Sequence, residues 1–345
     1  AYAFAGCKEL ENISFDNVVT IGDYAFATLD NQRANKLTTI KFGDTLTTIG
    51  EYAFYGSINV KNIKLGKNVS SIGRYAFSRL NVLESVTVDG NLEVISECLF
   101  AEDKALKEVN INGIKVVEGG AFMNCNLLEA IDLSSATSIG MEAFSGCIGL
   151  TSVDLSNVVT LEAGAFLMCS NLSDVTLKVV ERIEAQSLSC IGITELILPN
   201  TLSYIAPTAF NYNQNFVKFI SADNKVNGFI NDYILLDDGG LYTVTSNDKY
   251  LLSCYPTAKE NNSYSVLFNT VRIEEYAGYF NQNLQSLILP DTLELIGNMS
   301  FYGCIKLETV EFRSTTAPIL EGTVSLLDLE YDEGTEIYNL LNKFL

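Results

Sequence analysis

The chain has 345 residues, 48% of them hydrophobic, and its 22 basic and 42 acidic side chains give a formal net charge of −20 at pH 7. This excess of acid argues against nucleic acid or an anionic membrane surface as a partner, because both attract basic patches. The absence of histidine excludes Ser–His and Cys–His nucleophile pairs, and also histidine metal sites.

The sequence also bears on membrane-spanning segments and on the N-terminus. It contains no run of about 18 apolar residues, so we expect no transmembrane helix and no membrane insertion of this segment. Its first residues, AYAF, already lie inside a repeat, so we expect the natural N-terminus to lie upstream. The sequence therefore does not decide whether a signal peptide precedes it.

An internal repeat with a period of 22 to 23 residues runs along most of the chain. We call the phenylalanine of its Ala-Phe pair, or the residue that replaces it, the anchor of each repeat. The anchors are Phe4, Phe26, Phe54, Phe77, Phe100, Phe122, Phe144, Phe166, Leu188, Phe210 and Phe301, with a weaker one at Gly278. The gap of 28 residues after Phe26 indicates a loop insertion at 29–35. Such periodicity is typical of solenoids, in which each repeat packs against its neighbours.

The repeat at residues 139–155, IGMEAFSGCIGLTSVDL, shows what one unit contains. Ala143, Phe144, Cys147 and Leu150 recur at steps of one and three residues, which predicts a short helix of about two turns. The alternation in residues 153–155 predicts a short strand with one buried face. The sequence therefore predicts an α/β solenoid made of short parallel strands, extended segments and short helices, forming one elongated domain over residues 1–345.

The motif IGxxAFxxCxxLxxIxL, complete for example in residues 296–312, resembles the BspA-like leucine-rich repeats, also called Treponema pallidum type repeats, of bacterial surface proteins. The resemblance covers nearly all of the chain. It implies a curved right-handed superhelix with the parallel sheet on its concave side. Because members of that family are known or suspected adhesins, it also implies an extracellular or cell-surface location and a host extracellular-matrix or cell-surface protein as partner.

Four stretches differ in how regular the repeat is. Residues 1–222 are regular, 223–270 are degenerate and rich in predicted strands, 271–312 hold the final repeats, and 313–345 are expected to cap the solenoid, with a helix near EIYNLLNKFL. Within the degenerate stretch, residues 237–240 (DDGG) predict a hairpin turn. This stretch is interpreted as part of the solenoid or, alternatively, as a projecting binding element.

Five of the eight cysteines stand three residues after an anchor, a position that is expected to face the core. They are Cys7, Cys125, Cys147, Cys169 and Cys304. We favour free buried thiols that act as small hydrophobic groups. Disulfides between neighbouring repeats and a metal site remain alternatives, although no Cys-x-x-Cys pair exists.

Polar residues at the outward positions of the predicted strands form two rows, which the resemblance places on the concave face. The candidate protein-binding residues are Glu108, Asn110, Asp132, Asp154, Asp174, Thr176 and Glu195. Like charges at the strand spacing of about 5 Å repel unless they are solvated or neutralised. The rows are interpreted as a solvated polar face, as a surface for basic protein ligands, or as a cation site.

Tyrosines form a third row, two residues before the anchors, with Tyr24, Tyr52 and Tyr75 as its candidate contact residues. Stacked aromatic rings would add packing between repeats, and they could also form a partner surface. We expect a non-enzymatic binding module without cofactor or metal. The alternative is a structural spacer that presents another domain. Carbohydrate binding is least favoured, because the concave rows contain no exposed aromatic residue.

Overall fold

The structure is a computed structural model that describes residues 1–28 and 35–321. Its internal contacts divide the chain into two compact units, Ala1–Val180 and Glu181–Leu345, which we call unit 1 and unit 2 and describe separately. The domain boundaries expected from the sequence remain a prediction. No helix of the described residues is long and apolar enough to cross a membrane.

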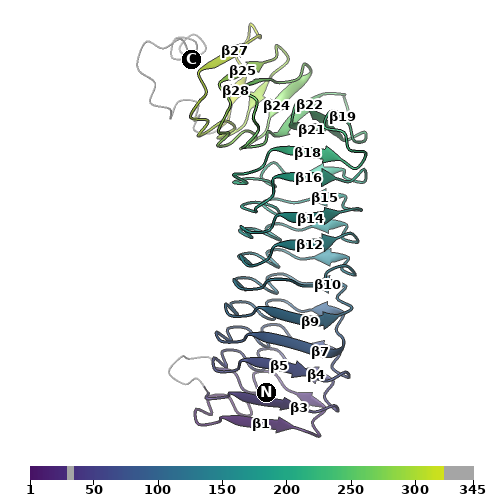
Figure 1. Ribbon diagram of the computed structural model, residues 1–345, viewed down its shortest axis with the longest axis vertical. Helices are drawn as coiled ribbons and strands as arrows, with labels where there is room; N and C mark the ends of the chain where they lie inside the picture. Colours follow the sequence, from purple (N-terminus) through teal and green to yellow (C-terminus); the bar gives the residue numbers. More distant parts are fainter. Residues whose placement is uncertain (29–34, 322–345) are drawn as a thin grey trace. The chain divides into compact units, whose positions relative to one another are not determined.

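In unit 1 each repeat forms one coil. Longer strands build the first ladder (Figure 1), one from each coil except that of Phe122, which contributes only an isolated bridge at Ala130. These strands are β1 (Asn12–Phe15), β3 (Thr39–Phe42), β5 (Asn62–Leu65), β7 (Ser85–Asn91), β9 (Glu108–Asn112), β12 (Ser152–Leu155) and β14 (Asp174–Leu177). All the pairs β1–β3, β5–β7, β7–β9 and β12–β14 are parallel. The register joins residues one repeat apart, for example Ile63 with Val86, so inward side chains meet inward side chains.

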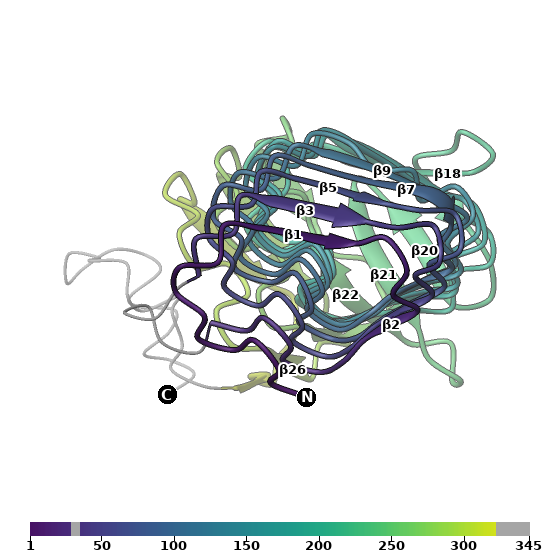
Figure 2. The same ribbon diagram turned by 90° about the horizontal axis from the view of Figure 1, so that it is seen from below.

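A second parallel ladder in unit 1 consists of two-residue strands on another side of the coils, as the view along the stack shows (Figure 2). These strands are β2 (Thr20–Ile21), β4 (Thr48–Ile49), β6 (Ser71–Ile72), β8 (Val94–Ile95), β10 (Val116–Val117), β11 (Ser138–Ile139) and β13 (Thr160–Leu161). The second residue of each strand is buried, because it is the apolar residue that lies inside the coil just before the turn segment begins.

The predicted helices are wrong: the described residues contain no α-helix, and the fold is a parallel β-solenoid. Each anchor region is instead a run of turns, which we call the turn segment and which reaches from two residues before to two residues after the anchor. In the coil of Phe144, the amides of Glu142, Phe144 and Gly146 donate to carbonyls of the next coil at 2.8–3.0 Å. The intervening amide of Ser145 closes a turn on the carbonyl of Glu142.

Backbone conformation explains why no helix forms. Glu142 and Gly146 have φ of 54° and 76°, in the left-handed region that a right-handed helix cannot include. The same two places have positive φ in other coils of unit 1, as at Tyr52 (53°) and Gly56 (70°). Each coil therefore bends twice around its anchor and turns alternate amides along the stack, which makes a third ladder of backbone hydrogen bonds.

The core of unit 1 is a column of stacked anchor rings. From Phe26 to Phe166, successive rings are 5.1–6.0 Å apart and within 20° of parallel. These rings are at most 2% exposed, and burying each contributes about 2–3 kcal/mol. The cysteines three residues beyond the anchors are free thiols; Cys125, Cys147 and Cys169 are buried as expected, whereas Cys7 is exposed.

Unit 2 begins with the same pattern. Its strands are β15 (Arg182–Ile183), β16 (Glu195–Leu198), β17 (Tyr204–Ile205), β18 (Lys218–Ser221), β19 (Gly228–Phe229), β20 (Ile234–Asp237), β21 (Gly240–Val244), β22 (Tyr250–Cys254), β23 (Ser263–Ser265), β24 (Thr270–Ile273), β25 (Ser286–Leu289), β26 (Leu295–Ile296), β27 (Thr309–Phe312) and β28 (Ile319–Leu320). One sheet has the order β19-β20-β21-β22-β24-β26-β28, and another has the order β23-β25-β27.

The degenerate stretch forms antiparallel strands that continue into the parallel ladder of unit 2. The predicted hairpin is confirmed: β20 and β21 pair antiparallel, and Asp238 and Gly239 make its turn with φ of 39° and 83°. Strand β22 then pairs antiparallel with β21 and parallel with β24. The helix expected near EIYNLLNKFL lies outside the described residues.

Candidate functional site

The outward side chains of the first ladder in unit 1 form a surface that we call the strand face. It carries six of the seven residues predicted for protein binding. Glu108, Asn110, Asp132, Asp154 and Asp174 are exposed, and Thr176 is half-buried. Glu195 is different, because it lies in unit 2, where it faces Lys218 across β16 and β18 and forms an ion pair of 3.1 Å with it.

The outward residues of the strand face form two columns, because the register aligns equivalent positions of neighbouring strands. Asp154 lies beside Thr176, and Ser152 lies beside Asp174, across β12 and β14. Glu108 forms an isolated bridge with Ala130, so the coil of Asp132 continues the ladder from β9. The structure thus places the four acidic residues predicted for protein binding in unit 1, Glu108, Asp132, Asp154 and Asp174, on consecutive coils.

Charge changes along the strand face. On its N-terminal coils the lysines are paired: Lys41 with Asp16 at 2.6 Å and Lys64 with Asp89 at 3.3 Å. Among the described residues, Glu108, Asp132, Asp154 and Asp174 form no ion pair. We call these four side chains the acidic patch. Because no ion pair neutralises it within the described residues, its charge is available to an external cation or basic group.

Two aspartates of the acidic patch are fixed in place by serines two residues further on. Ser134 donates both its hydroxyl (2.6 Å) and its amide (3.0 Å) to Oδ1 of Asp132. Ser156 makes the same two bonds to Asp154. These bonds favour the ionised form and lower the pKa of both carboxyls. Both side chains are therefore negatively charged and oriented at neutral pH.

A specific metal site is not part of this arrangement. Within residues 1–28 and 35–321, no three or more His, Cys, Asp or Glu side chains gather in a way that could hold a metal ion. The acidic patch is instead spread along consecutive coils, one carboxylate to a coil.

The predicted tyrosine row is a continuous stack. The rings of Tyr2, Tyr24, Tyr52 and Tyr75 follow one another at 4.6–4.7 Å and within 11° of parallel. Tyr24, Tyr52 and Tyr75 are half-buried. A hydrogen bond between Tyr75 and the thiol of Cys98, together with burial, raises the pKa of Tyr75 to about 12. The row therefore packs the coils together, and the half-buried rings leave only part of their surface open to a partner.

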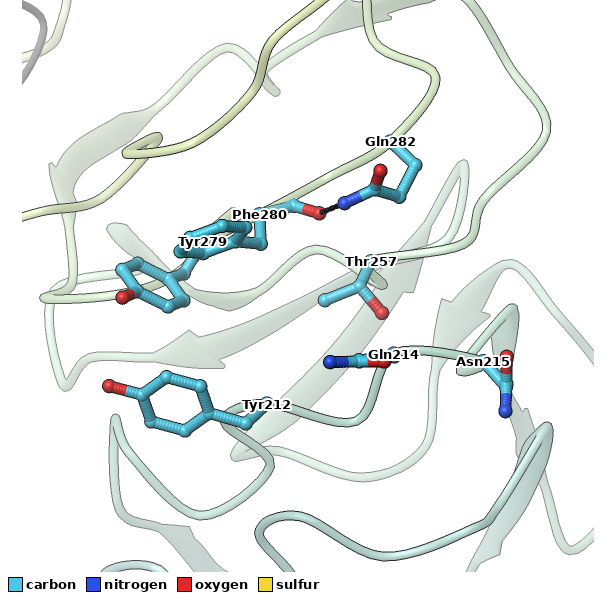
Figure 3. Close-up of a pocket in the computed structure, with 7 residues that line it drawn as sticks. All are labelled: Tyr212, Gln214, Asn215, Thr257, Tyr279, Phe280 and Gln282. Atoms are coloured by element: carbon cyan, nitrogen blue, oxygen red, sulfur yellow. Dashed lines mark hydrogen bonds between the residues drawn. The ribbon is translucent and has the colours of Figure 1, made fainter.

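Sequence reasoning missed a pocket on unit 2. It has a volume of about 430 Å³ and is lined by Tyr212, Gln214, Asn215, Thr257, Tyr279, Phe280 and Gln282 (Figure 3). We call it the aromatic pocket. Its residues lie in or just after three turn segments that are distant in the sequence. The signal that could have found it is the cluster of aromatic and amide residues just after the anchors Phe210 and Gly278.

The sequence of the chain matches a known repeat family. The chain matches the BspA type leucine rich repeat region at residues 1–129, 115–234 and 258–329. The chain belongs to this family. The resemblance inferred from IGxxAFxxCxxLxxIxL is thereby confirmed, and the chain is a leucine-rich-repeat protein of the kind found in bacterial surface proteins.

Solved structures of leucine-rich-repeat proteins share the fold. A leucine rich cell surface protein from Faecalibacterium prausnitzii A2-165 is 23% identical, with a TM-score of 0.57 over 90% of this chain and 72% of that one. A leucine-rich repeat protein from Bacteroides ovatus is 19% identical, with a TM-score of 0.53 over 93% of this chain and 86% of the other. A search of curated proteins finds no match. At these identities the likeness concerns the fold alone.

Proposed function

We propose that the chain is a non-enzymatic protein-binding module of a bacterial cell-surface or secreted protein, and that it adheres to host or cell-surface proteins through the strand face of unit 1. The observation that carries this proposal is the acidic patch. Its four carboxylates are exposed and without ion pairs among the described residues, while Lys41 and Lys64 of the same face are paired. A basic surface of the partner would supply the missing counter-charge.

The family supports the proposed location and the proposed class of function. BspA type repeats occur in surface proteins, and one similar structure is that of a leucine rich cell surface protein. A stack of coils offers a long, regular surface on which the outward residues vary while the buried positions keep the fold. A host extracellular-matrix protein or a cell-surface protein is the proposed partner.

The runner-up is a spacer array that presents another domain. The observation that favours it is the uniform backbone bonding of unit 1, in which the strand ladders and the turn segments repeat from coil to coil. A spacer needs this regularity and no particular surface chemistry. The two readings differ in what the acidic patch does, because neutralising it would leave a spacer unchanged.

The experiment measures binding of the full chain to immobilised fibronectin, laminin and collagen, with oligolysine as a probe of charge alone, at several salt concentrations. The double variant Asp132→Asn/Asp154→Asn keeps the acceptors for Ser134 and Ser156 and removes two charges. We expect weaker binding and a flatter salt dependence, since screening acts on the remaining charge only.

The matched control is Glu142→Gln/Glu162→Gln. It removes the same number of charges at two exposed residues that follow the short strands β11 and β13, away from the strand face. We expect this variant to bind like the unmodified chain. Equal loss of binding in both double variants would reduce the effect to net charge, and retained binding in the first would contradict the strand face as the binding surface.

A further inference from the structure

The aromatic pocket lies at a coil that does not show the repeat motif in the sequence. This coil stands between the coils with the anchors Phe210 and Gly278. The amide of Tyr255 donates to the carbonyl of Ala277 in the following coil, as the anchor Phe54 donates to Ala76 in unit 1. Tyr255 is therefore an anchor, and Thr257 stands two residues after it. This coil is hidden in the sequence because the preceding segment folds as antiparallel hairpins.

The hollow is produced by a small residue between two large ones. Tyr212, Thr257 and Phe280 each stand two residues after an anchor, in three turn segments of unit 2 that line the same pocket. Figure 3 shows Thr257 beside the aromatic rings, at a height between Phe280 above and Tyr212 below. Its hydroxyl donates to the carbonyl of Asn213, which ties the middle coil to the one before it.

The aromatic walls are held in place before any ligand arrives. The ring centroids of Tyr212 and Tyr279 are 5.1 Å apart, with planes at 76°, and those of Tyr279 and Phe280 are 4.5 Å apart at 64°. Tyr302 also stacks on Tyr279, at 5.6 Å. Tyr212 and Phe280 nevertheless remain 46% and 40% exposed. The pocket thus presents preformed ring surfaces to solvent, which reduces the entropy lost on binding.

The other lining groups include three amides. Gln282 donates its Nε2 to the carbonyl of Phe280 at 2.8 Å, which fixes its orientation. Gln214 and Asn215 are exposed, and their side chains make no hydrogen bond within the described part of the chain. An amide side chain both donates and accepts hydrogen bonds. Among the described residues, no lysine, arginine, aspartate or glutamate lines the pocket.

We infer that the aromatic pocket is a binding site for a neutral carbohydrate. Sugar rings have a C–H face that packs on an aromatic ring and hydroxyls that both donate and accept, which the amides can match. An anionic ligand would lack a counter-charge, and a metal cation would lack carboxylates. The volume of about 430 Å³ falls in the range of small-molecule sites and has room for a short saccharide.

This site lies outside the acidic patch and is independent of the proposed protein binding. Carbohydrate binding was the least favoured expectation from the sequence, because the predicted concave rows contain no exposed aromatic residue. The exposed rings are present, but they belong to the turn segments of unit 2 and not to the strands.

Saturation-transfer difference NMR and calorimetry on the full chain test the site with cellotriose, maltotriose, mannotriose, xylotriose and N-acetylchitotriose. We expect at least one of these probes to bind. Tyr212→Ala and Gln214→Ala should each raise its Kd about tenfold, through the lost ring face and the lost hydrogen bonds respectively. The exposed side chain of Gln214 makes no hydrogen bond within the described residues, so its variant reports on binding even if a ring variant unfolds.

The control is Tyr233→Ala, which removes a tyrosine of similar exposure (53%) elsewhere in unit 2 and should leave the Kd unchanged. Asp132→Asn/Asp154→Asn should also leave it unchanged, which separates this site from the proposed protein-binding surface. The inference is overturned if none of the five saccharides binds, or if binding survives both pocket variants. It is equally overturned if a proline-rich peptide, and no saccharide, occupies the pocket.

Discussion

Leu80 donates its backbone amide to Oδ1 of the buried Asp103 at 2.7 Å, across two neighbouring coils. In unit 2, Asn213 occupies the corresponding place three residues after an anchor. Its Oδ1 accepts from the amide of Ile191 at 2.9 Å, and its Nδ2 donates to the carbonyl of Leu188 at 2.8 Å. Asp103 makes only the first of these bonds, and its Oδ2 is buried without a partner. Burial raises the pKa of Asp103 well above its ordinary value of 3.8.

The substitution Asp103→Asn is expected to stabilise unit 1 at neutral pH. Because the pKa of Asp103 is raised on folding, the acid stabilises the fold fully below about pH 4, and stability falls as pH rises toward the folded-state pKa. The introduced amide would supply the missing donor at every pH, so the gain at neutral pH is about 1–3 kcal/mol. Urea unfolding from acid to neutral pH measures it, and a variant whose stability falls with pH as much as that of the unmodified chain contradicts the assignment.

Tyr52 is expected to tolerate glycine better than alanine. Both substitutions lose the stacks with Tyr24 and Tyr75, each with a centroid distance of 4.7 Å and worth about 0.5–1.5 kcal/mol. Alanine also keeps the cost of φ at 53°, which glycine avoids, so the alanine variant should be less stable by about 0.5–1 kcal/mol. Gly120 and Gly164 stand at this position where the tyrosine row has ended. Equal urea midpoints for the two variants would show that the left-handed backbone costs nothing there.

Gly140 is expected to be required by its close contact with the preceding coil. A Cβ atom on Gly140 would lie 2.7 Å from the amide nitrogen of Gly119, so Gly140→Ala should destabilise unit 1 by about 1–3 kcal/mol. Gly66 is a glycine of unit 1 whose added Cβ would meet first Oδ1 of the exposed side chain of Asp44, at 3.1 Å, and that side chain can move aside. Gly66→Ala should therefore change stability by less than about 0.5 kcal/mol. Similar thermal midpoints for both variants would contradict this explanation.

Cys7 is expected to react first with a thiol reagent. It is exposed, whereas Cys147 is buried and donates its thiol to the carbonyl of Phe122 at 3.2 Å. Burial raises the pKa of Cys147 and of Cys169, the latter to about 12, so little thiolate forms in the folded state. Colourimetric labelling with and without urea measures the difference. Cys7→Ser should remove the fast phase, and a fast phase that persists would mean that the half-buried Cys190 or Cys254, or a buried thiol, reacts as fast as Cys7.

The parts of the fold that depend on buried apolar periodicity were predictable. The anchors indicated the coils, and alternation around Val153 and Leu155 indicated strand β12 with the expected inward face. The helices were not predictable, because Ala143, Phe144 and Cys147 have the same spacing in a helix and in a run of turns. The distinguishing fact is a positive φ at Glu142, which no side chain reveals. Glycines at the equivalent places in other coils were the available sign.

The candidate surfaces were predictable in part. The register of β12 and β14 follows from the repeat length, so neighbours such as Asp154 and Thr176 could be inferred. Ion pairing could not, because it depends on which long side chain reaches which carboxylate, as with Lys218 and Glu195. The aromatic pocket was hidden because its middle coil has Tyr255 in place of the phenylalanine anchor.

The hydrogen bonds between coils run along the stack, in the strand ladders and in the turn segments alike. A force that pulls the two ends of unit 1 apart along the stack would therefore act along those bonds and peel off one coil at a time. Each peeled coil of 22 residues frees roughly 75 Å of extended chain, at about 3.4 Å per residue. Such a stack would yield to mechanical load in successive steps of similar length, with a longer step for the 28-residue spacing after Phe26, as an extensible tether does.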